Sequence, residues 1–377
     1  MNIYLDNSAT TRIKEEVFAA MEPFLKENYG NASSVYSFGK IARSKIEESR
    51  DKIASILGAQ SNEVFFTSGG SESDNWAIKG SAFANMECGK DIMTTKIEHK
   101  AVLESFEYLK KFGFNPIYLD LNESGIVDIE ILESKLTDDT IFLSMMYANN
   151  EIGTIQPISK ISELIKSKDI LFHVDGVQAL PYIDINLRKL NIDLFTASAH
   201  KIGGPKGIGL LYKKKGSKVD NLIHGGSQEM GKRAGTENVA FIVGFAKAME
   251  IVTNNREKNI LKIKKMRDFM LNKLLSVKGV YLNGDFINRL PGNINISIEK
   301  VDSQLLLMLL DKRGVCTSSG SACNAGSINP SHVLKAIGRN DELAKNCLRI
   351  TINEDNNMDE IIEASDIIIS TINSLRG

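Results

Sequence analysis

The sequence predicts an α/β fold in which helices cover a mostly parallel sheet, followed by a smaller α+β domain. Three observations support this prediction. Between about residues 50 and 215, seven short runs are rich in apolar, β-branched or aromatic residues and are closed by Gly, Asn or Asp. Segments with helical periodicity lie between many of these runs, which is the alternation of a βαβ sheet. After about residue 255 the pattern changes to a long charged segment followed by shorter elements.

The expected strands are four to seven residues long and end at polar or glycine-containing turns. They are Val64–Thr67, Asp91–Thr95, Pro116–Leu121, Ile141–Tyr147, Ile170–Val174, Leu194–Ala197 and Ile208–Tyr212. Helices are expected over Ser73–Ala84 and Ile158–Lys166, and a long charged helix over Arg256–Leu275. We therefore expect a large domain over residues 14–255 and a small domain formed by residues 1–13 and 256–377.

The composition is that of an ordinary globular protein. Of 377 residues, 46 are Lys or Arg and 47 are Asp or Glu, so the net charge is −1, and we expect neither direct nucleic-acid binding nor membrane binding. The N-terminus has no basic segment followed by an apolar one, and the longest apolar runs are far shorter than the ~20 residues that span a bilayer. These features predict a cytoplasmic protein.

The chain has four cysteines, Cys88, Cys316, Cys323 and Cys347, without a CxxC pair or a Cys/His cluster of zinc spacing. We therefore expect no metal site. In a reducing compartment, a cysteine with a special role is more often catalytic than structural. Buried, inert positions suit Cys88 and Cys347, and the position of Cys316 after an apolar strand leaves its role open.

Cys323 lies in a segment of almost only Ser, Gly, Ala, Asn and Thr, residues 317–329. Such a composition cannot pack into a core, and we expect a mobile loop. The next helix is expected to begin at Asn329-Pro330, with Asn as the capping residue and Pro at the first helical position.

A glycine- and serine-rich turn follows the first expected strand, in FFTSGGSESDN. Its residues Ser68, Gly69, Gly70 and Ser71 can present N–H groups and hydroxyls to an anion at the N-terminus of the next helix. A tight turn with a capping side chain explains the same residues equally well. Because the pattern is neither GxGxxG nor a Walker loop, a nucleotide is not indicated.

Two charged residues end apolar strands. Asp175, in LFHVDGVQA, either caps the next helix at the surface or pairs with a pyridinium nitrogen, since a buried carboxylate needs a cation. Gln178 is close enough in sequence to reach the same place. Lys201, in SAHKIGG, is expected to be partly desolvated, which lowers the pKa of an amine and suits Schiff-base chemistry. A structural lysine would more usually lie on a solvated helix face, so we favour a functional role for Lys201.

Polar residues follow two further expected strands. His99 follows one in TTKIEHKAVL, and Asn149, Asn150 and Glu151 follow another in MMYANNEIG. A single histidine is more often structural, and Asn-rich turns are common in loops. Taken alone, neither segment indicates a function.

Taken together, these segments resemble the NifS/IscS-type cysteine desulfurases, which are fold-type I pyridoxal phosphate enzymes related to class V aminotransferases. The matching segments, from residue 4 to residue 334, are YLDNSATT, NYGNASSVYSFG, FTSGGSESDN, IEHKAVL, NNEIG, HVDGVQA, SAHKIGGPKGIG, RAGTEN, and SSGSAC followed by NPSHVL. SAHK and SSGSAC are highly specific in this order. The resemblance implies a large domain that binds pyridoxal phosphate on a seven-stranded sheet and a small domain that carries the catalytic cysteine.

The resemblance also implies roles for individual residues. Lys201 would form the Schiff base, His99 would stack on the ring and assist proton transfer, and Cys323 would accept the sulfur. The other implied contacts are Asp175 at the pyridinium nitrogen, Gln178 at the phenolic oxygen, Gly70, Ser71, Ser198 and His200 at the phosphate, Thr236 at the phosphate of the neighbouring subunit, Asn150 beside cofactor and substrate, and Arg349 at the substrate carboxylate.

The implied activity is the conversion of L-cysteine to L-alanine by a homodimer, with the sulfur passing as a Cys323 persulfide to an acceptor protein of iron–sulfur cluster assembly or tRNA thiolation. Departures from the family pattern at Met230 and at Asn324-Ala325 would affect a dimer contact and the choice of acceptor. One alternative is an aminotransferase or selenocysteine lyase on the same scaffold, which Cys323 would distinguish. Another is a non-catalytic adaptor, against which Lys201, Asp175 and His99 argue.

Overall fold

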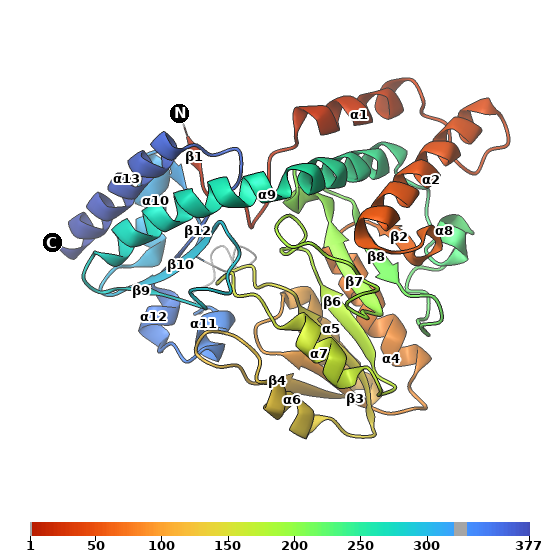
Figure 1. The fold of residues 1–377 in the computed structure, drawn as a ribbon, viewed down its shortest axis with the longest axis horizontal. Coiled ribbons are helices and arrows are strands. Elements are labelled where there is room, and N and C mark those ends of the chain that lie inside the picture. Colours follow the sequence, from red (N-terminus) through yellow and green to blue (C-terminus); the bar gives the residue numbers. More distant parts are fainter. Residues whose placement is uncertain (1, 320–329) are drawn as a thin grey trace.

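The computed structural model describes residues 2–319 and 330–377, and its centre is a seven-stranded sheet (Figure 1). In spatial order the strands are β2 (Val64–Thr67), β8 (Gly209–Lys213), β7 (Leu194–Ser198), β6 (Leu171–Asp175), β5 (Thr140–Met146), β3 (Asp91–Thr95) and β4 (Asn115–Leu119). Only β8 runs antiparallel to its neighbours. The predicted α/β fold is confirmed, and each predicted strand agrees with the structure to within two residues at either end.

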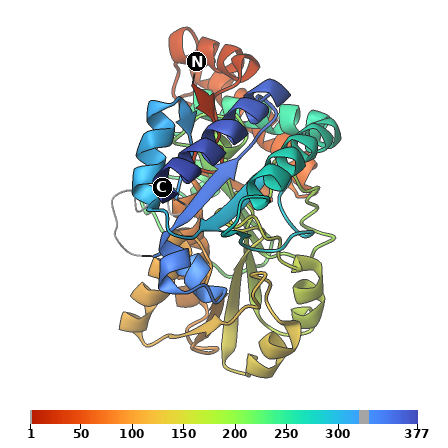
Figure 2. The same ribbon diagram turned by 90° about the vertical axis from the view of Figure 1, so that its left-hand side faces the viewer.

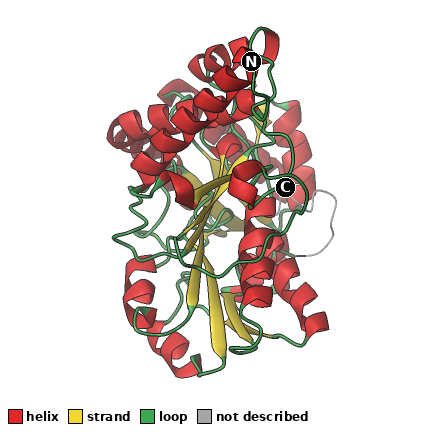
Figure 3. Cartoon of the chain, turned by 90° about the vertical axis from the view of Figure 1, so that its right-hand side faces the viewer, coloured by secondary structure: helices red, strands yellow, loops and turns green. Residues whose placement is uncertain are grey.

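Helices cover both faces of this sheet (Figure 3). The helices that pack on one face are α1 (Glu15–Lys26), α2 (Ser37–Leu57), α6 (Ile129–Lys135), α7 (Ile158–Ile165) and the first half of α9 (Val239–Leu275). The other face is covered by α3 (Gly70–Asn75), a π-helical turn (Trp76–Gly80), α4 (Ser81–Ala84) and α5 (Lys100–Leu109). Central strand β5 is buried along its whole length, with Phe142 in one core and Leu143 in the other. Burial on both faces explains why its sequence is mostly apolar, apart from Thr140 and Ser144, rather than alternating.

A second hydrophobic core lies beside the sheet. Its strands are β12 (Cys347–Thr351), β10 (Asn293–Ile298) and β9 (Val280–Leu282), which form an antiparallel sheet, and β1 (Ile3–Tyr4), which pairs in parallel with β11 (Val315–Cys316). Its helices are α10 (Ser303–Lys312) and α13 (Met358–Arg376), with α11 (His332–Ala336) and α12 (Asp341–Lys345) nearby. The short remaining helices are Ser61–Glu63, Lys110–Phe112, Ala199–Lys201 and α8 (Gln228–Gly231).

Helix α9 connects the two cores (Figures 1 and 2). It begins at Val239 rather than at the predicted Arg256, because the Asn238 side chain accepts a hydrogen bond from Phe241 N and caps the helix there. The apolar first half packs against α1 and α2, and only the second half carries the charged pattern that the sequence analysis recognised. The domain limits at residues 13/14 and 255/256 stay a prediction.

Two local predictions are wrong. Helix α11 begins at His332 and is capped by Ser331, whose Oγ accepts a hydrogen bond of 3.2 Å from Leu334 N; Asn329 lies outside the described residues. Cys88 is exposed, since it follows the end of α4 in a turn, whereas Cys347 is buried as expected. No helix among the described residues is long and apolar enough to cross a membrane.

Candidate active site

A cavity of about 430 Å³ lies where the strands of the large sheet end. The predicted site residues that line it are Gly70, Ser71, His99, Asn150, Asp175, Gln178, Ser198, His200, Lys201 and Arg349. They come from segments far apart in the sequence, because the carboxyl ends of parallel strands meet at one edge of a sheet. Two predicted residues are not among them: Thr236 is exposed on another segment, and Cys323 lies outside the described residues.

Lys201 enters the cavity from the helical turn that follows β7. Its Nζ donates hydrogen bonds to the backbone oxygens of Ser8, at 2.5 Å, and Ala9, at 2.8 Å. The side chain is half-buried, as predicted for a strand-end lysine. Ser8 and Ala9 belong to the YLDNSATT segment, but no feature of that segment indicated a role for either residue.

Asp175 is 6% exposed at the end of β6, which confirms that it is a buried carboxylate rather than a surface cap. Its Oδ1 accepts a hydrogen bond of 2.9 Å from Val177 N. Burial raises the pKa of Asp175, while the hydrogen bond and the electrostatic interactions with His99 and Lys201 act to lower it. Gln178 donates from Nε2 to the Ser8 oxygen at 3.0 Å, beside Lys201.

The glycine- and serine-rich turn forms one end of the cavity. Helix α3 begins at Gly70, where an added Cβ would lie 3.1 Å from Val177 Cγ2, so a small residue keeps this end open. Ser71, Ser198 and His200 surround it. Burial, followed by the charges of Lys201 and Lys206, lowers the pKa of His200 to about 4, so His200 is a neutral hydrogen-bonding group at neutral pH.

His99 caps helix α5 from the cavity wall. Its Nδ1 accepts a hydrogen bond of 3.2 Å from Ala101 N. An accepting Nδ1 carries no proton, so the neutral ring bears its proton on Nε2. This contact sets the orientation and the tautomer of the ring.

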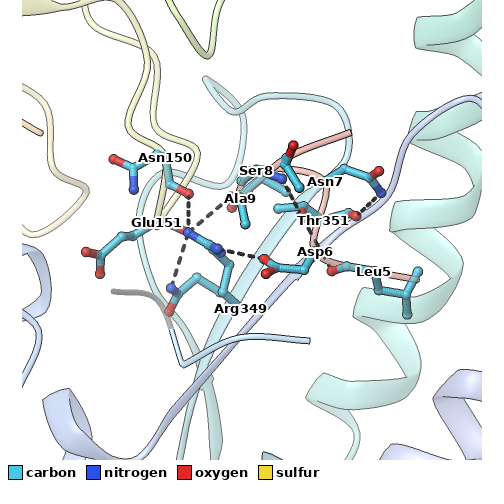
Figure 4. Close-up of polar contacts among 12 residues, drawn as sticks. Leu5, Asp6, Asn7, Ser8, Ala9, Asn150, Glu151, Arg349 and Thr351 are labelled. Atoms are coloured by element: carbon cyan, nitrogen blue, oxygen red, sulfur yellow. Dashed lines mark hydrogen bonds and ion pairs between the residues drawn. The ribbon is translucent and has the colours of Figure 1, made fainter. Parts of the chain in front are cut away.

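Arg349 lies on β12 and is 1% exposed (Figure 4). Its Nη2 is 2.6 Å from Asp6 Oδ1, and its Nη1 donates to the backbone oxygen of Asn150 at 3.3 Å. Asp6 is a residue that the sequence analysis missed. It lies within the YLDNSATT segment, which matched the family as a whole without giving Asp6 a role.

Two further buried carboxyls line the cavity and were not predicted, Asp74 and Glu98. Burial raises the pKa of Glu98 to about 8, although its Oε1 accepts a 2.6 Å hydrogen bond from Thr95 Oγ1. Asp74 follows Gly70 by four residues on the same helix. Residues four apart lie on one helix face, so this spacing could have predicted that both face the cavity.

The site fits pyridoxal phosphate in both charge and donor chemistry. Gly70, Ser71, Ser198 and His200 suit a phosphate, and the buried carboxyls of the same lining suit a cationic ring nitrogen. Asp74 Oδ1 is buried without a hydrogen-bond partner among the described residues. Lys201 lines the same cavity. Among the described residues, no group of three or more His, Cys, Asp and Glu side chains could hold a metal ion.

Comparison with known proteins agrees with this chemistry along the whole chain. The family described as aminotransferase class-V matches residues 3–363. The chain is 48% identical over 375 residues to cysteine desulfurase IscS of Dictyoglomus turgidum, covering 99% of this chain and 95% of the relative, and 46% identical over 375 residues to the protein of that name from Methanosarcina thermophila, covering 100% and 93%.

Solved structures of similar proteins have the same fold over nearly the whole chain. A NifS-like protein superposes with a TM-score of 0.94 at 37% identity, covering 99% of this chain and 100% of that one. A structure described as SspA in complex with cysteine has a TM-score of 0.83 at 34% identity, covering 93% and 99%.

Proposed function

The chain belongs to the class-V aminotransferase family, as a pyridoxal-phosphate-dependent cysteine desulfurase, and we propose how its own residues perform that activity. The observation that carries the proposal is the convergence of Lys201, Asp175, His99 and Arg349 on one cavity. When bound, pyridoxal phosphate supplies an aldehyde that combines with amines and a protonated ring that withdraws electrons from the amino-acid Cα.

Residues that line the cavity hold the cofactor. Gly70, Ser71, Ser198 and His200 bind the phosphate, and the Asp175 carboxylate pairs with the ring nitrogen. Gln178, already oriented by the Ser8 oxygen, binds the phenolic oxygen.

Three residues act on the substrate. Lys201 binds the cofactor aldehyde through Nζ and moves the Cα proton of the amino acid. His99 assists proton transfer through Nε2 and stacks on the cofactor ring. Arg349 binds the substrate carboxylate, with Asn150 beside it, because a guanidinium can form two parallel hydrogen bonds to a carboxylate.

Cys323 accepts the sulfur in this proposal, on the strength of the SSGSAC segment. Its thiolate attacks the sulfur of the substrate, so that an S–S bond forms while the Cβ–S bond breaks. The products are a Cys323 persulfide and L-alanine. The persulfide then passes to an acceptor protein of iron–sulfur cluster assembly or tRNA thiolation, and the unusual Asn324-Ala325 pair affects which acceptor binds.

The active protein is proposed to be a cytoplasmic homodimer in which Thr236 reaches the phosphate bound by the neighbouring subunit. Large apolar side chains of α1, α2 and their connection are exposed, among them Tyr29 at 74%, Val35 at 84% and Tyr36 at 59%. Several exposed large apolar side chains within one segment favour burial against a second chain. Met230, 50% exposed and near Thr236 in sequence, would lie in or beside that contact.

The stoichiometry of cysteine turnover tests this function against transamination. We expect one L-alanine and, with a thiol reductant present, one sulfide for each L-cysteine consumed, without any keto acid. An aminotransferase on the same scaffold would instead require a keto acid and would release no sulfide. Chromatography of products with and without pyruvate distinguishes the two, and strict dependence on pyruvate would contradict the desulfurase mechanism.

A further inference from the structure

A chain of buried polar groups runs beneath the cavity, across three neighbouring strands of the large sheet. Ser144 on β5 and His173 on β6 are paired residues, and Thr196 lies on β7. His173 Nδ1 is 2.9 Å from Ser144 Oγ, and Nε2 is 3.0 Å from Thr196 Oγ1. All three are fully buried. The chain ends at Asp74 on α3, whose Oδ1 is 3.7 Å from His173 Nε2.

His173 does not supply a positive charge to Asp74. Burial lowers the pKa of His173 to about 3, so its imidazole is neutral at neutral pH. A neutral imidazole has a single N–H, and each of its nitrogens already faces a hydroxyl. Asp74 has no Lys or Arg within ion-pair distance among the described residues, and its Oδ1 has no hydrogen-bond partner there.

The surroundings of Asp74 and Asp175 differ in charge. Burial and the neighbouring Asp175 carboxylate raise the pKa of Asp74, Glu98 acts in the same direction, and only the Thr196 hydroxyl opposes them. Asp175 is also buried, yet His99 and Lys201 favour its ionised form. A single negative charge shared by the two carboxyls therefore belongs on Asp175.

We propose that Asp74 is a positioning residue held as a neutral carboxylic acid in the cavity wall, so that Asp175 carries the only negative charge of the pair. A second carboxylate at full burial would add an uncompensated charge to the one that faces the ring nitrogen. The Ser144–His173–Thr196 chain holds Asp74 in place without adding charge. This inference rests on the proposed role of Asp175.

The protonation state of Asp74 is measurable by infrared difference spectroscopy of the cofactor-loaded protein at neutral pH. Asp74→Asn is nearly isosteric. We expect this substitution to remove the carbonyl band of a protonated carboxylic acid and to leave the carboxylate bands unchanged. Asp120→Asn is the matched control, because Lys96 lowers the pKa of the exposed Asp120 and its replacement removes carboxylate bands instead. Loss of a carboxylate band in Asp74→Asn would overturn the proposal.

Cofactor retention provides a second, independent readout. Asparagine is uncharged, like a protonated Asp74, so the cofactor dissociation constant of Asp74→Asn is expected to stay within about threefold of wild type. Asp175→Asn removes a negative charge and is expected to weaken cofactor binding by about tenfold or more. Equal weakening by both substitutions would contradict the assignment of the charge to Asp175 alone.

The two hypotheses fail in different ways. Wild-type retention by Asp175→Asn would count against the proposed role of Asp175, while the infrared result on Asp74, repeated in cofactor-free protein, would still decide its protonation. Thr196→Val gives a further variant that leaves both carboxyls intact. It removes the hydroxyl beside Asp74 and is expected to shift the frequency of the same acid band; an unshifted band would contradict the proposed arrangement.

Discussion

Replacing Lys201 with alanine is expected to abolish cysteine turnover and the visible absorbance of the lysine-bound cofactor together. The substitution removes both the amine that binds the aldehyde and the base that moves the Cα proton. Proton transfer alone contributes about 10²–10⁴-fold to rate, so we expect a loss of at least about 10⁴-fold when the covalent role is lost as well. Alanine formation in single-turnover experiments gives the rate, and absorbance gives the cofactor state.

Lys215→Ala is the matched control for this prediction. Lys215 is exposed beyond β8 and does not line the cavity, so its replacement is expected to leave turnover and absorbance unchanged. Turnover by Lys201→Ala within tenfold of wild type would contradict the proposed role.

Replacing Arg349 with alanine is expected to have the second-largest effect, and the effect should depend on the substrate carboxylate. The guanidinium is 1% exposed and paired with Asp6, so its position is set before substrate binds. Truncating one partner of a buried, hydrogen-bonded charge pair costs about 2–5 kcal/mol, and we therefore expect kcat/KM for L-cysteine to fall by about 10²–10³-fold.

Cysteamine, which lacks the carboxylate, separates substrate binding from general damage. If Arg349 binds the carboxylate, its replacement leaves the already weak conversion of cysteamine nearly unchanged. Asp6→Asn retains the guanidinium but weakens its ion pair, so its effect on L-cysteine is expected to be smaller than that of Arg349→Ala. An equal loss with both substrates would show that Arg349 acts through the structure and not through the carboxylate.

The sequence predicts the sheet well because strands buried on both faces are short runs of mostly apolar residues, which are easy to recognise. Strand β5 is apolar at five of its seven positions, and the polar residues at the ends of β2, β6 and β7 mark where the cavity forms. The start of α9 was harder to predict, because its apolar first half packs on two other helices and does not resemble the charged second half. The N-terminus of that helix depends on one capping contact from Asn238.

The site was predictable where chemistry concentrates in a short segment, and less so where it depends on long-range contacts. Lys201 and Asp175 each follow an apolar run, so local sequence suggested their roles. The acceptors of the Lys201 amine are backbone oxygens of Ser8 and Ala9, more than 190 residues away. Asp6 and Arg349 are likewise distant in sequence, and nothing in either local segment indicates that they form a pair.

The central claim is that sulfur passes from L-cysteine to Cys323, and peptide mass spectrometry after a single turnover without reductant tests it most directly. We predict that the Cys323 peptide of the wild-type protein gains the mass of one sulfur atom while one equivalent of L-alanine forms. Cys323→Ala is expected to keep the absorbance of the bound cofactor but to gain no sulfur and to form no alanine. Normal alanine formation by Cys323→Ala, or sulfur found on Cys316 instead, would contradict the account.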